Sequence, residues 1–436
     1  MGSSFFIQNF GCRATQADGA ALEAALLARG FAAAGRDCAD LVILNTCTVT
    51  SAADDDVRHA VRRVRRENPD ARIVVTGCYA QRAPEEVAAL PGVDWVVGNS
   101  HKGQIADMLA SEVSEGTPYH GQIRVGDIFE QQEFLAAVVE DASGDRTRPN
   151  LKIQDGCNNR CSFCIIPFVR GRSRSARPEW VIEQVGRLGA RYREVVLSGI
   201  NLGRWGRDLD GGRLRLAGLV KRLLDETGVE RLRLSSVEPM DWSDDLLGLM
   251  AESSRVAKHV HAPLQTGSDT VLRRMHRKYR PRHYEDRIRK ARALMPDAAI
   301  GADVMVGFPC ESDAEFEENR AFIESLPFTY LHVFTYSERP GTPAAEAASH
   351  VPIPVRKERN RILRELAAEK NLAFRRGMVG KALSAVTLEQ RGIALSGNYL
   401  KIELDSEREP NRLIDVQIGA VSAAGLREAA TLPIFP

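Results

Sequence analysis

The sequence avoids extremes of composition, and each thing it lacks excludes a class of protein. Its 436 residues contain no apolar run near the roughly 18 residues of a membrane-spanning helix, so we expect no membrane span. Lys and Arg number 59 against 58 acidic residues, which excludes a globally basic nucleic-acid-binding chain. The first residues show no cationic segment with a cleavage site, and internal repeats are missing. We therefore expect a cytoplasmic protein with several globular domains.

Short apolar runs alternate with amphipathic stretches in the N-terminal quarter of the chain. Residues 5–9, 41–45, 73–76 and 95–97 are typical of strands separated by helices. This order predicts a small parallel α/β domain over residues 1–113. The polar stretch that follows, residues 114–150, should contain the first domain boundary.

From Leu151 onward, strand-like runs recur at the spacing of βα units. They cover residues 151–154, 194–198, 231–235, 259–261, 300–306 and 330–334. Six such units predict a partial (β/α)6 barrel over residues 143–376, with its chemistry at the carboxyl ends of the strands. A charged helix at 354–376 ends this region. The alternating tail predicts a small β-barrel over 377–436, with strands at 385–388, 399–404 and 413–418.

Three of the eight cysteines form a compact motif after the first barrel strand. Cys157, Cys161 and Cys164 have the spacing C-x-x-x-C-x-x-C. Three thiolates can hold a [4Fe-4S] cluster and leave one iron open. An open iron can bind S-adenosylmethionine, which reductive cleavage converts to an adenosyl radical. A structural zinc site is the alternative, but zinc needs a fourth ligand and no further Cys or His stands close by in the sequence.

A second group of cysteines is spread over the N-terminal region. Cys12, Cys47 and Cys78 each follow a predicted strand, and the carboxyl ends of parallel strands meet at one edge of a sheet. These three could hold a second cluster with an open iron, or they could be ordinary buried core cysteines. We interpret Cys38 as structural and Cys310, at the end of a barrel strand, as a packing residue.

The segments around these cysteines resemble the methylthiotransferase family of radical S-adenosylmethionine enzymes over nearly the whole chain. The resemblance implies one [4Fe-4S] cluster for each cysteine group, S-adenosylmethionine as both radical source and methyl donor, and a TRAM-like C-terminal barrel. The matching segments, in family order, are Phe10 to Cys12, Asn45 to Thr50, Thr76 to Cys78, Lys152 to Cys157, Ser198 to Gly203, Ser235 to Pro239, His261 to Ser268, Met275 to Arg277 and Phe334 to Thr342.

Within the family, Asn45 to Thr50 and the following helix from Arg58 to Arg66 resemble most the branch that acts on N6-threonylcarbamoyladenosine beside the tRNA anticodon, and the segment after Cys47 separates the branches. The implied product is the 2-methylthio derivative. Sister branches modify isopentenyladenosine in tRNA or an aspartate of a ribosomal protein, and both alternatives stay open. The sequence departs from the family at residues 14–16 and at Cys310, where the family often has Gly.

The resemblance also implies partners and cofactor-binding residues. The expected partners of a monomeric enzyme are tRNA, an electron donor such as a flavodoxin or ferredoxin, and a sulfur donor. Residues near the ends of barrel strands are candidates to hold S-adenosylmethionine, although each could serve loop structure alone. They are Phe163, Gly199, Ser236, Glu238, Gln265, Arg277 and Gly307.

Two groups of arginines are candidates to bind RNA phosphates. The alternative for both is a solvated charged face. The first group lies in one predicted helix and the second just past the C-x-x-x-C-x-x-C motif: Arg58, Arg62, Arg63 and Arg66, and then Arg170, Arg172 and Arg174.

Two other classes of protein fit the sequence less well. A cobalamin-dependent radical enzyme would carry a D-x-H-x-x-G loop, and residues 1–112 contain none. A two-cluster electron carrier would need neither a six-unit barrel nor an open iron on each cluster.

Overall fold

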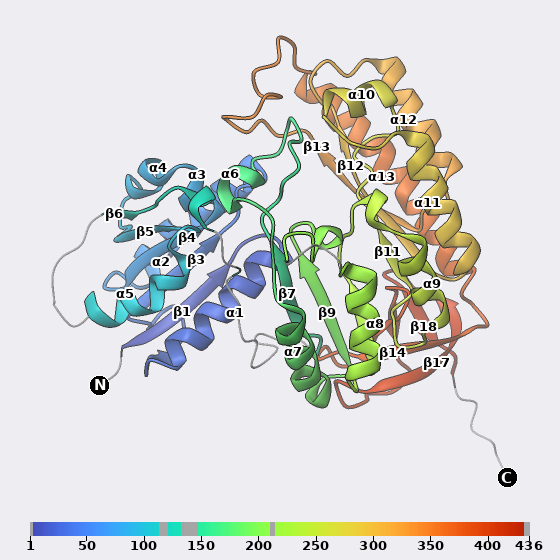
Figure 1. Ribbon diagram of the computed structural model, residues 1–436, viewed down its shortest axis with the longest axis horizontal. Coiled ribbons are helices and arrows are strands. Elements are labelled where there is room, and N and C mark those ends of the chain that lie inside the picture. The colour runs from blue at the N-terminus through green and yellow to red at the C-terminus, as the bar shows by residue number, and fades with distance from the viewer. Residues whose placement is uncertain (1–2, 113–120, 132–133, 135–146, 210–213, 431–436) are drawn as a thin grey trace. The chain divides into compact units, whose positions relative to one another are not determined.

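The structure is a computed structural model that describes residues 3–112, 121–131, 134, 147–209 and 214–430 (Figure 1). The chain divides into two compact units. The first takes in residues 1–140, 152–176 and 337–345, and the second takes in 141–151, 177–336 and 346–436. The C-x-x-x-C-x-x-C loop therefore groups with the N-terminal residues. The division into domains at 1–113, 143–376 and 377–436 stays a prediction, and much of the predicted boundary at 114–150 lies outside the described residues.

The first unit is built on a six-stranded parallel sheet with the order β2-β1-β3-β4-β5-β6. The four strands predicted in the sequence are present, and two short edge strands, β2 and β6, are added. The elements of this unit are β1 (Ser4–Asn9), α1 (Arg13–Leu27), β2 (Ala32–Ala33), β3 (Leu41–Thr46), α2 (Ser51–Glu67), β4 (Arg72–Gly77), α3 (Cys78–Arg82), α4 (Pro84–Ala88), β5 (Trp95–Gly98), η1 (Lys102–Gln104), α5 (Ile105–Glu112), β6 (Gln122–Arg124), η3 (Ile128–Glu130), α6 (Ile166–Arg170) and β8 (Arg174–Ser175).

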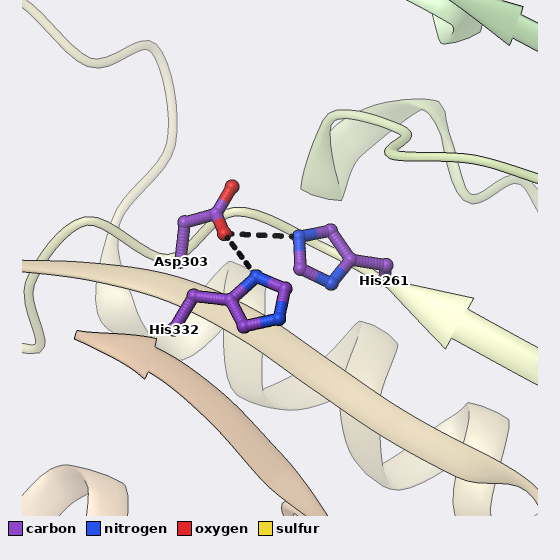
Figure 2. Close-up of side chains that lie close together, drawn as sticks. All are labelled: His261, Asp303 and His332. Atoms are coloured by element: carbon purple, nitrogen blue, oxygen red, sulfur yellow. Dashed lines mark hydrogen bonds and ion pairs between the residues drawn. The ribbon is translucent and has the colours of Figure 1, made fainter. Parts of the chain in front are cut away.

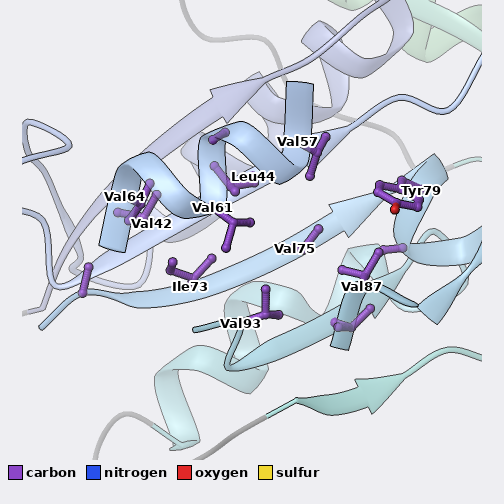
Figure 3. Packing of buried hydrophobic residues seen from close by; sticks show 14 of the residues in the cluster. Val42, Leu44, Val57, Val61, Val64, Ile73, Val75, Tyr79, Val87 and Val93 are labelled. Atoms are coloured by element: carbon purple, nitrogen blue, oxygen red, sulfur yellow. The ribbon is translucent and has the colours of Figure 1, made fainter. Parts of the chain in front are cut away.

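Helices cover both faces of this sheet, which explains its continuous apolar strands. Val42 and Leu44 of β3 pack beneath α2 in a cluster that includes Val57 and Val61 (Figure 3). Leu41 and Ile43 point to the other face, where they join residues of α1 and α5. The carboxyl ends of β1, β3 and β4 remain at one edge of the sheet, directly before the three N-terminal cysteines.

The second unit contains the parallel strands of the predicted partial barrel. β9 and β10 pair in parallel, a bridge between Ser236 and His261 connects β10 to β11, and β11, β12 and β13 pair in parallel. β7 (Asn150–Asp155) begins in this unit, where Val196 N–H donates to Pro149 O at 2.9 Å, and runs into the first unit. The barrel elements are α7 (Pro178–Arg191), β9 (Glu194–Gly199), η4 (Leu202–Arg204), α8 (Leu216–Glu226), β10 (Arg231–Leu234), η6 (Pro239–Asp241), α9 (Asp244–Glu252), β11 (His259–His261), α10 (Asp269–Arg274), α11 (Pro281–Leu294), β12 (Ala299–Val306), α12 (Asp313–Ser325), β13 (Tyr330–Thr335) and α13 (Ile353–Arg376).

The C-terminal residues close into a five-stranded barrel with the order β14-β15-β16-β18-β17. Its strands are β14 (Ala382–Thr387), β15 (Ile393–Ser396), β16 (Lys401–Glu403), β17 (Leu413–Val421) and β18 (Leu426–Glu428). The α/β fold class with a C-terminal β-barrel is thereby confirmed. Of the helices in the described residues, none has the length and hydropathy that crossing a membrane requires.

A buried ion pair ties this small barrel to the sheet of the second unit. Arg233 on β10 and Glu194 on β9 are fully buried and pair at 2.7 Å. Arg233 also donates to the carbonyl oxygens of Ser396 and Gly397 in the small barrel, at 3.0 and 3.2 Å. Burial opposes the charge of Glu194, but the arginines outweigh it, Arg233 foremost, and lower the pKa of Glu194 to about 2.

We predict that Glu194→Gln destabilises the second unit by about 3–5 kcal/mol, because Arg233 would stay buried without a counter-ion. The stabilisation is fully present above the ordinary carboxyl pKa of 4.5 and is lost as the pH falls toward 2. The difference between the two proteins should therefore be largest at neutral pH in urea unfolding and shrink in acid. Glu226→Gln, which removes an exposed pair with Arg222, is the control and should change little. An equal effect of both changes would contradict the assignment.

Candidate iron-sulfur site

The C-x-x-x-C-x-x-C loop is held in one conformation by its backbone. Gly156, directly before Cys157, has φ +69°, and a Cβ there would lie 1.9 Å from Arg172 O, so only glycine fits. Cys157 N–H donates to Gly171 O, and Asn159 N–H donates to Cys157 Sγ at 3.4 Å. Three half-buried thiols on one braced loop fit the ligand set of a [4Fe-4S] cluster with an open iron.

Cys12, Cys47 and Cys78 follow β1, β3 and β4, as predicted, and the structure brings them together. A Cβ at Gly11, which has φ +92°, would lie 2.8 Å from Cys47 Sγ. Burial raises the pKa of Cys47 to about 12, and the nearby charges of Cys78 and Cys12 add to that rise. The N-terminal cysteines are therefore a cluster of thiols at one sheet edge.

Neither cysteine group has the spacing of a single-ion site. A tetrahedral zinc with Zn–S bonds of about 2.3 Å places its sulfurs about 3.8 Å apart. Among the described residues, neither group brings all three sulfurs within 4.8 Å of one another.

The two cysteine groups belong to the same unit and are joined by packing. Cys78 is buried against Ile165 and Val169, which lie in the segment directly after Cys164. Asn99 donates to Val169 O at 2.7 Å and lies 3.6 Å from Cys78 Sγ. The edge that carries the N-terminal cysteines is thus in direct contact with the helix after the second motif.

A buried charge network surrounds this junction, and the sequence did not reveal it. Asp18 on α1 pairs with Lys102 and Arg170 at 3.1 and 3.0 Å and also with Lys152. Asp155 pairs with Lys152 and Arg170 at 2.8 and 3.0 Å. Burial raises the pKa of Asp18, but the three cations outweigh burial and hold it well below its usual range. The two carboxylates therefore remain ionised between three buried cations.

The segment after Cys47 is fixed by a second set of charges. Asp54 accepts a hydrogen bond from Thr48 at 2.7 Å and pairs with Arg82 and Arg339 at 3.0 and 2.7 Å. All four residues belong to the first unit, although Arg339 stands far along the chain. These contacts fix Thr48 and Asp54 directly after Cys47.

The predicted RNA-binding arginines divide into buried and exposed residues. Arg170 and Arg174 are only 2% and 8% exposed, so their assignment to RNA phosphates is wrong: Arg170 neutralises Asp18 and Asp155, and Arg174 donates to backbone carbonyls. Arg58 is partly buried and pairs with Asp55 and Glu86. The remaining candidates are exposed: Arg62, Arg63, Arg66 and Arg172.

Most of the predicted cofactor-binding residues lie in the second unit, at or beyond strand ends. Gly199 ends β9, Gly307 follows β12, and Gln265 has a left-handed φ of +67°. Arg277 is buried and pairs with Glu238 at 2.6 Å. Ser236 bridges to His261, as described above, whereas Phe163 lies on the cysteine loop of the first unit.

The two remaining cysteines lie at the surface. Cys310 is exposed, which corrects its interpretation as a packing residue, and Cys38 is exposed with its Sγ 3.5 Å from Gly35 O. Cys310 has φ +61°, a conformation in which glycine is favoured, and its N–H donates to Ser349 O at 3.2 Å.

A cluster of titratable residues that the sequence analysis did not single out lies on β11–β13. His261 Nε2 and His332 Nδ1 lie 3.2 and 3.1 Å from the same oxygen of Asp303 (Figure 2). The three ligand atoms all lie within 4.8 Å of one another. We call these residues the triad. The sequence contains one signal for it: Asp303 and His332 are polar residues in otherwise apolar strands, and alternation of side chains along a strand puts each on a single face.

Two family models match the chain. "Uncharacterized protein family UPF0004" matches residues 4–98, the part that carries the N-terminal cysteines. The radical SAM superfamily matches residues 151–323, which include the second cysteine motif and most of the barrel strands.

Relatives match nearly the whole chain. It is 36% identical to the threonylcarbamoyladenosine tRNA methylthiotransferase of Aquifex aeolicus, over 94% of this chain and 99% of the relative. It is 35% identical to the tRNA-2-methylthio-N6-dimethylallyladenosine synthase of Pelotomaculum thermopropionicum, over 85% and 84%. A solved radical S-adenosylmethionine methyltransferase from Kitasatospora setae shares the fold, with a TM-score of 0.60 and 16% identity over 79% of this chain and 77% of that one.

We predict that Asp18→Asn destabilises the first unit by about 3–5 kcal/mol, because one carboxylate would be left to neutralise three buried cations. Urea unfolding measures the effect. Asp107→Asn, whose side chain is 69% exposed and pairs with Arg29, is the matched control and should change stability little. If Asp18→Asn were equally harmless, the network would not be a determinant of this unit's stability.

Proposed function

The chain belongs to the radical S-adenosylmethionine methylthiotransferase family and is a tRNA methylthiotransferase, and from that premise we propose that its substrate is N6-threonylcarbamoyladenosine beside the anticodon. The product would carry a methylthio group on C2 of the adenine. The observation that carries the proposed chemistry is the presence of two groups of three cysteines in one unit, with Cys78 of the first group packed against Ile165 and Val169 directly after the second.

The cysteine loop would hold the cluster that binds S-adenosylmethionine. When bound, this pair supplies an adenosyl radical that removes hydrogen from C2, a carbon that no side-chain base can deprotonate. Cys157, Cys161 and Cys164 supply the three thiolates, and the Asn159 N–H donates to one of them. The chain's part is to leave one iron open by offering three ligands instead of four.

The N-terminal cysteines would hold the second cluster, where the sulfur and methyl group are supplied. Cys47 and Cys78 are buried and Cys12 is exposed, so this site is closed on the protein side and open on the other. Arg170 lies close enough to lower the pKa of Cys47, in opposition to burial and the other two thiols. It thus favours the thiolate form that binds iron. A second molecule of S-adenosylmethionine would supply the methyl group.

Support for the substrate comes from similarity and from the segment after Cys47. The relatives at 36% and 35% identity have names that differ in the modified adenosine, so overall similarity alone separates the two substrates poorly. A dimethylallyladenosine substrate is therefore the second candidate. An electron donor such as a flavodoxin or ferredoxin and a sulfur donor would complete the reaction.

Exposed arginines of α2 are the proposed contacts to the tRNA backbone. Arg62, Arg63 and Arg66 lie on one surface helix, and Arg172 lies past the cysteine loop. A tRNA substrate needs local positive charge, because the chain as a whole is neutral.

We predict that replacing Cys12, Cys47 and Cys78 together by Ala removes about half of the iron but leaves cleavage of S-adenosylmethionine intact. Deoxyadenosine should still form, and no methylthio nucleoside should appear in tRNA. Mass spectrometry of digested tRNA from a deletion strain carrying the variant measures both product and identity: the parent protein should yield 2-methylthio-N6-threonylcarbamoyladenosine.

The control is Cys38→Ala, which should keep full iron content and product. If the triple variant still thiolated tRNA, or kept the iron content of the parent, the assignment of a second cluster to these three cysteines would be contradicted. A methylthio group found on dimethylallyladenosine instead would support the proposed reaction and contradict the proposed substrate.

We predict that Arg62→Ala, Arg63→Ala and Arg66→Ala together weaken tRNA binding and flatten its salt dependence. Each lost phosphate contact reduces the slope of log K against log salt by about 0.7–0.9. Fluorescence anisotropy at several salt concentrations measures the slope. A control with Arg289 and Arg361 replaced, each 55% exposed in the second unit, should keep the parent's slope. An unchanged slope in the α2 variant would contradict the proposed phosphate contacts and indicate that these arginines form a charged face in contact with solvent only.

A further inference from the structure

The three strands β11–β13 have one face covered and one face that is open except where Tyr399 of the small barrel stacks on His259. Ala302 and Val304 of β12 are fully buried, and α13 packs on β12 and β13. Asp303 and Met305 alternate with them and are only partly buried. In a partial barrel whose helices lie outside, the open face is the concave interior, where substrates of such folds are held.

The triad on this face is the end of a hydrogen-bonded chain. Tyr330 lies across Gly301, where a Cβ would meet its ring at 1.9 Å, so glycine makes the room for this ring. The Tyr330 hydroxyl lies 2.6 Å from His259 Nε2 and 2.8 Å from His261 Nδ1. The other ring nitrogen of His261 contacts Asp303, and the same oxygen of Asp303 contacts His332. Each imidazole is therefore held in one orientation by its neighbours.

His332 is the member of the triad that a ligand can reach most easily. Burial works against the charge of Asp303, but hydrogen bonds from His261 and His332 outweigh it and hold the pKa of Asp303 well below its usual range. The side chains of His261, Asp303 and His332 are 8%, 28% and 52% exposed, in that order. His332 is thus the outermost member, with Nδ1 directed at Asp303 and Nε2 directed away from it.

The triad lies beside some of the proposed cofactor-binding residues and further from others. Gly307 follows Asp303 by four residues, about 13 Å along a strand. Gln265 N–H donates to Asp303 O at 2.8 Å, and Met305 N–H donates to Gln265 O at 2.7 Å. Gln265, a residue assigned to the cofactor, is therefore bonded directly to the strand that carries Asp303, and a group bound at the triad would lie beside the cofactor.

We propose that the triad binds the carboxylate and hydroxyl of the threonyl group on the substrate adenosine, with His332 as the direct contact. This inference rests on the proposed function and names the residues that select its substrate. His332 Nδ1 faces Asp303, so Nε2 is the ring atom left for the ligand, where it can donate to the carboxylate when it carries a proton or accept from the hydroxyl when it does not. A dimethylallyl group offers no acceptor or charge, and its binding would leave these polar groups desolvated and unpaired.

The test measures binding of anticodon stem-loops to the holoenzyme by anaerobic fluorescence anisotropy. Four stem-loops differ only at the modified base: N6-threonylcarbamoyladenosine, its carboxyl methyl ester, N6-dimethylallyladenosine and adenosine. The wild-type protein should bind the free carboxylate most tightly. His332→Ala should weaken that stem-loop about tenfold or more and leave the other three unchanged.

Two further variants separate contact from positioning. His332→Asn keeps a donor near Nδ1 but removes the outer one, so it should behave like His332→Ala. His332→Gln places an amide near Nε2 and should retain part of the preference. His283→Ala, an exposed histidine on α11, is the matched control and should bind all four stem-loops as the wild type does.

Equal weakening of all four stem-loops by His332→Ala, or a wild-type protein that binds the ester as tightly as the free carboxylate, would overturn the inference. So would loss of a bound metal ion, beyond the cluster iron, from His332→Ala alone. Failure of the proposed function gives a different result, since the nucleoside analysis above would then show the methylthio group on another nucleoside, whatever His332 does.

Discussion

The arrangement of the first unit depends on one constraint: Asp18 must neutralise cations that three separate segments bury. Lys102, Lys152 and Arg170 come from far apart in the chain, and Asp18 contacts all of them. Since an uncompensated buried charge costs several kcal/mol, the cysteine loop cannot leave this position without exposing or stranding a cation. The same Arg170 acts on the thiol of Cys47. A single electrostatic requirement thus fixes the helix after one cysteine group beside the other group.

Bringing the two cysteine groups into one unit has a chemical meaning. A radical formed at one site is useful only if the sulfur source lies within reach of the same substrate atom. Residues 152–176 contribute to the unit of the N-terminal sheet, even though their motif follows a barrel strand. The barrel unit contributes a different property, which is an interior whose polar side chains are held by hydrogen bonds before any ligand arrives. Under the proposed function, the positioning of the chemistry and the selection of the substrate would be tasks of different units.

Patterns that are local in sequence predicted much of this fold, and long-range pairing explains what they missed. The apolar runs of β3 and β4 and the alternation of β17 predict strands because burial on one or two faces sets their period. β2 and β6 were missed because edge strands of two and three exposed residues carry no such pattern. The C-x-x-x-C-x-x-C spacing located the cysteine loop. Arg170 and Arg174 looked like a basic surface because the partner of Arg170, Asp18, stands 152 residues earlier. The triad is likewise assembled from three strands, so no single segment reveals it.

The attachment of the C-terminal barrel bears on how such enzymes can be recombined. Arg233 and Glu194 are sealed beneath residues 396 and 397, whose carbonyl oxygens complete the shell of hydrogen bonds around the guanidinium. A truncated chain that ends before the barrel would open a charged pair to water, and a grafted barrel would have to offer carbonyl groups in the same places. Exchange of this part between relatives is therefore a matter of matching residues 396 and 397 as much as of matching the barrel as a whole. Chimeras designed around that turn should fold where those designed around overall barrel similarity do not.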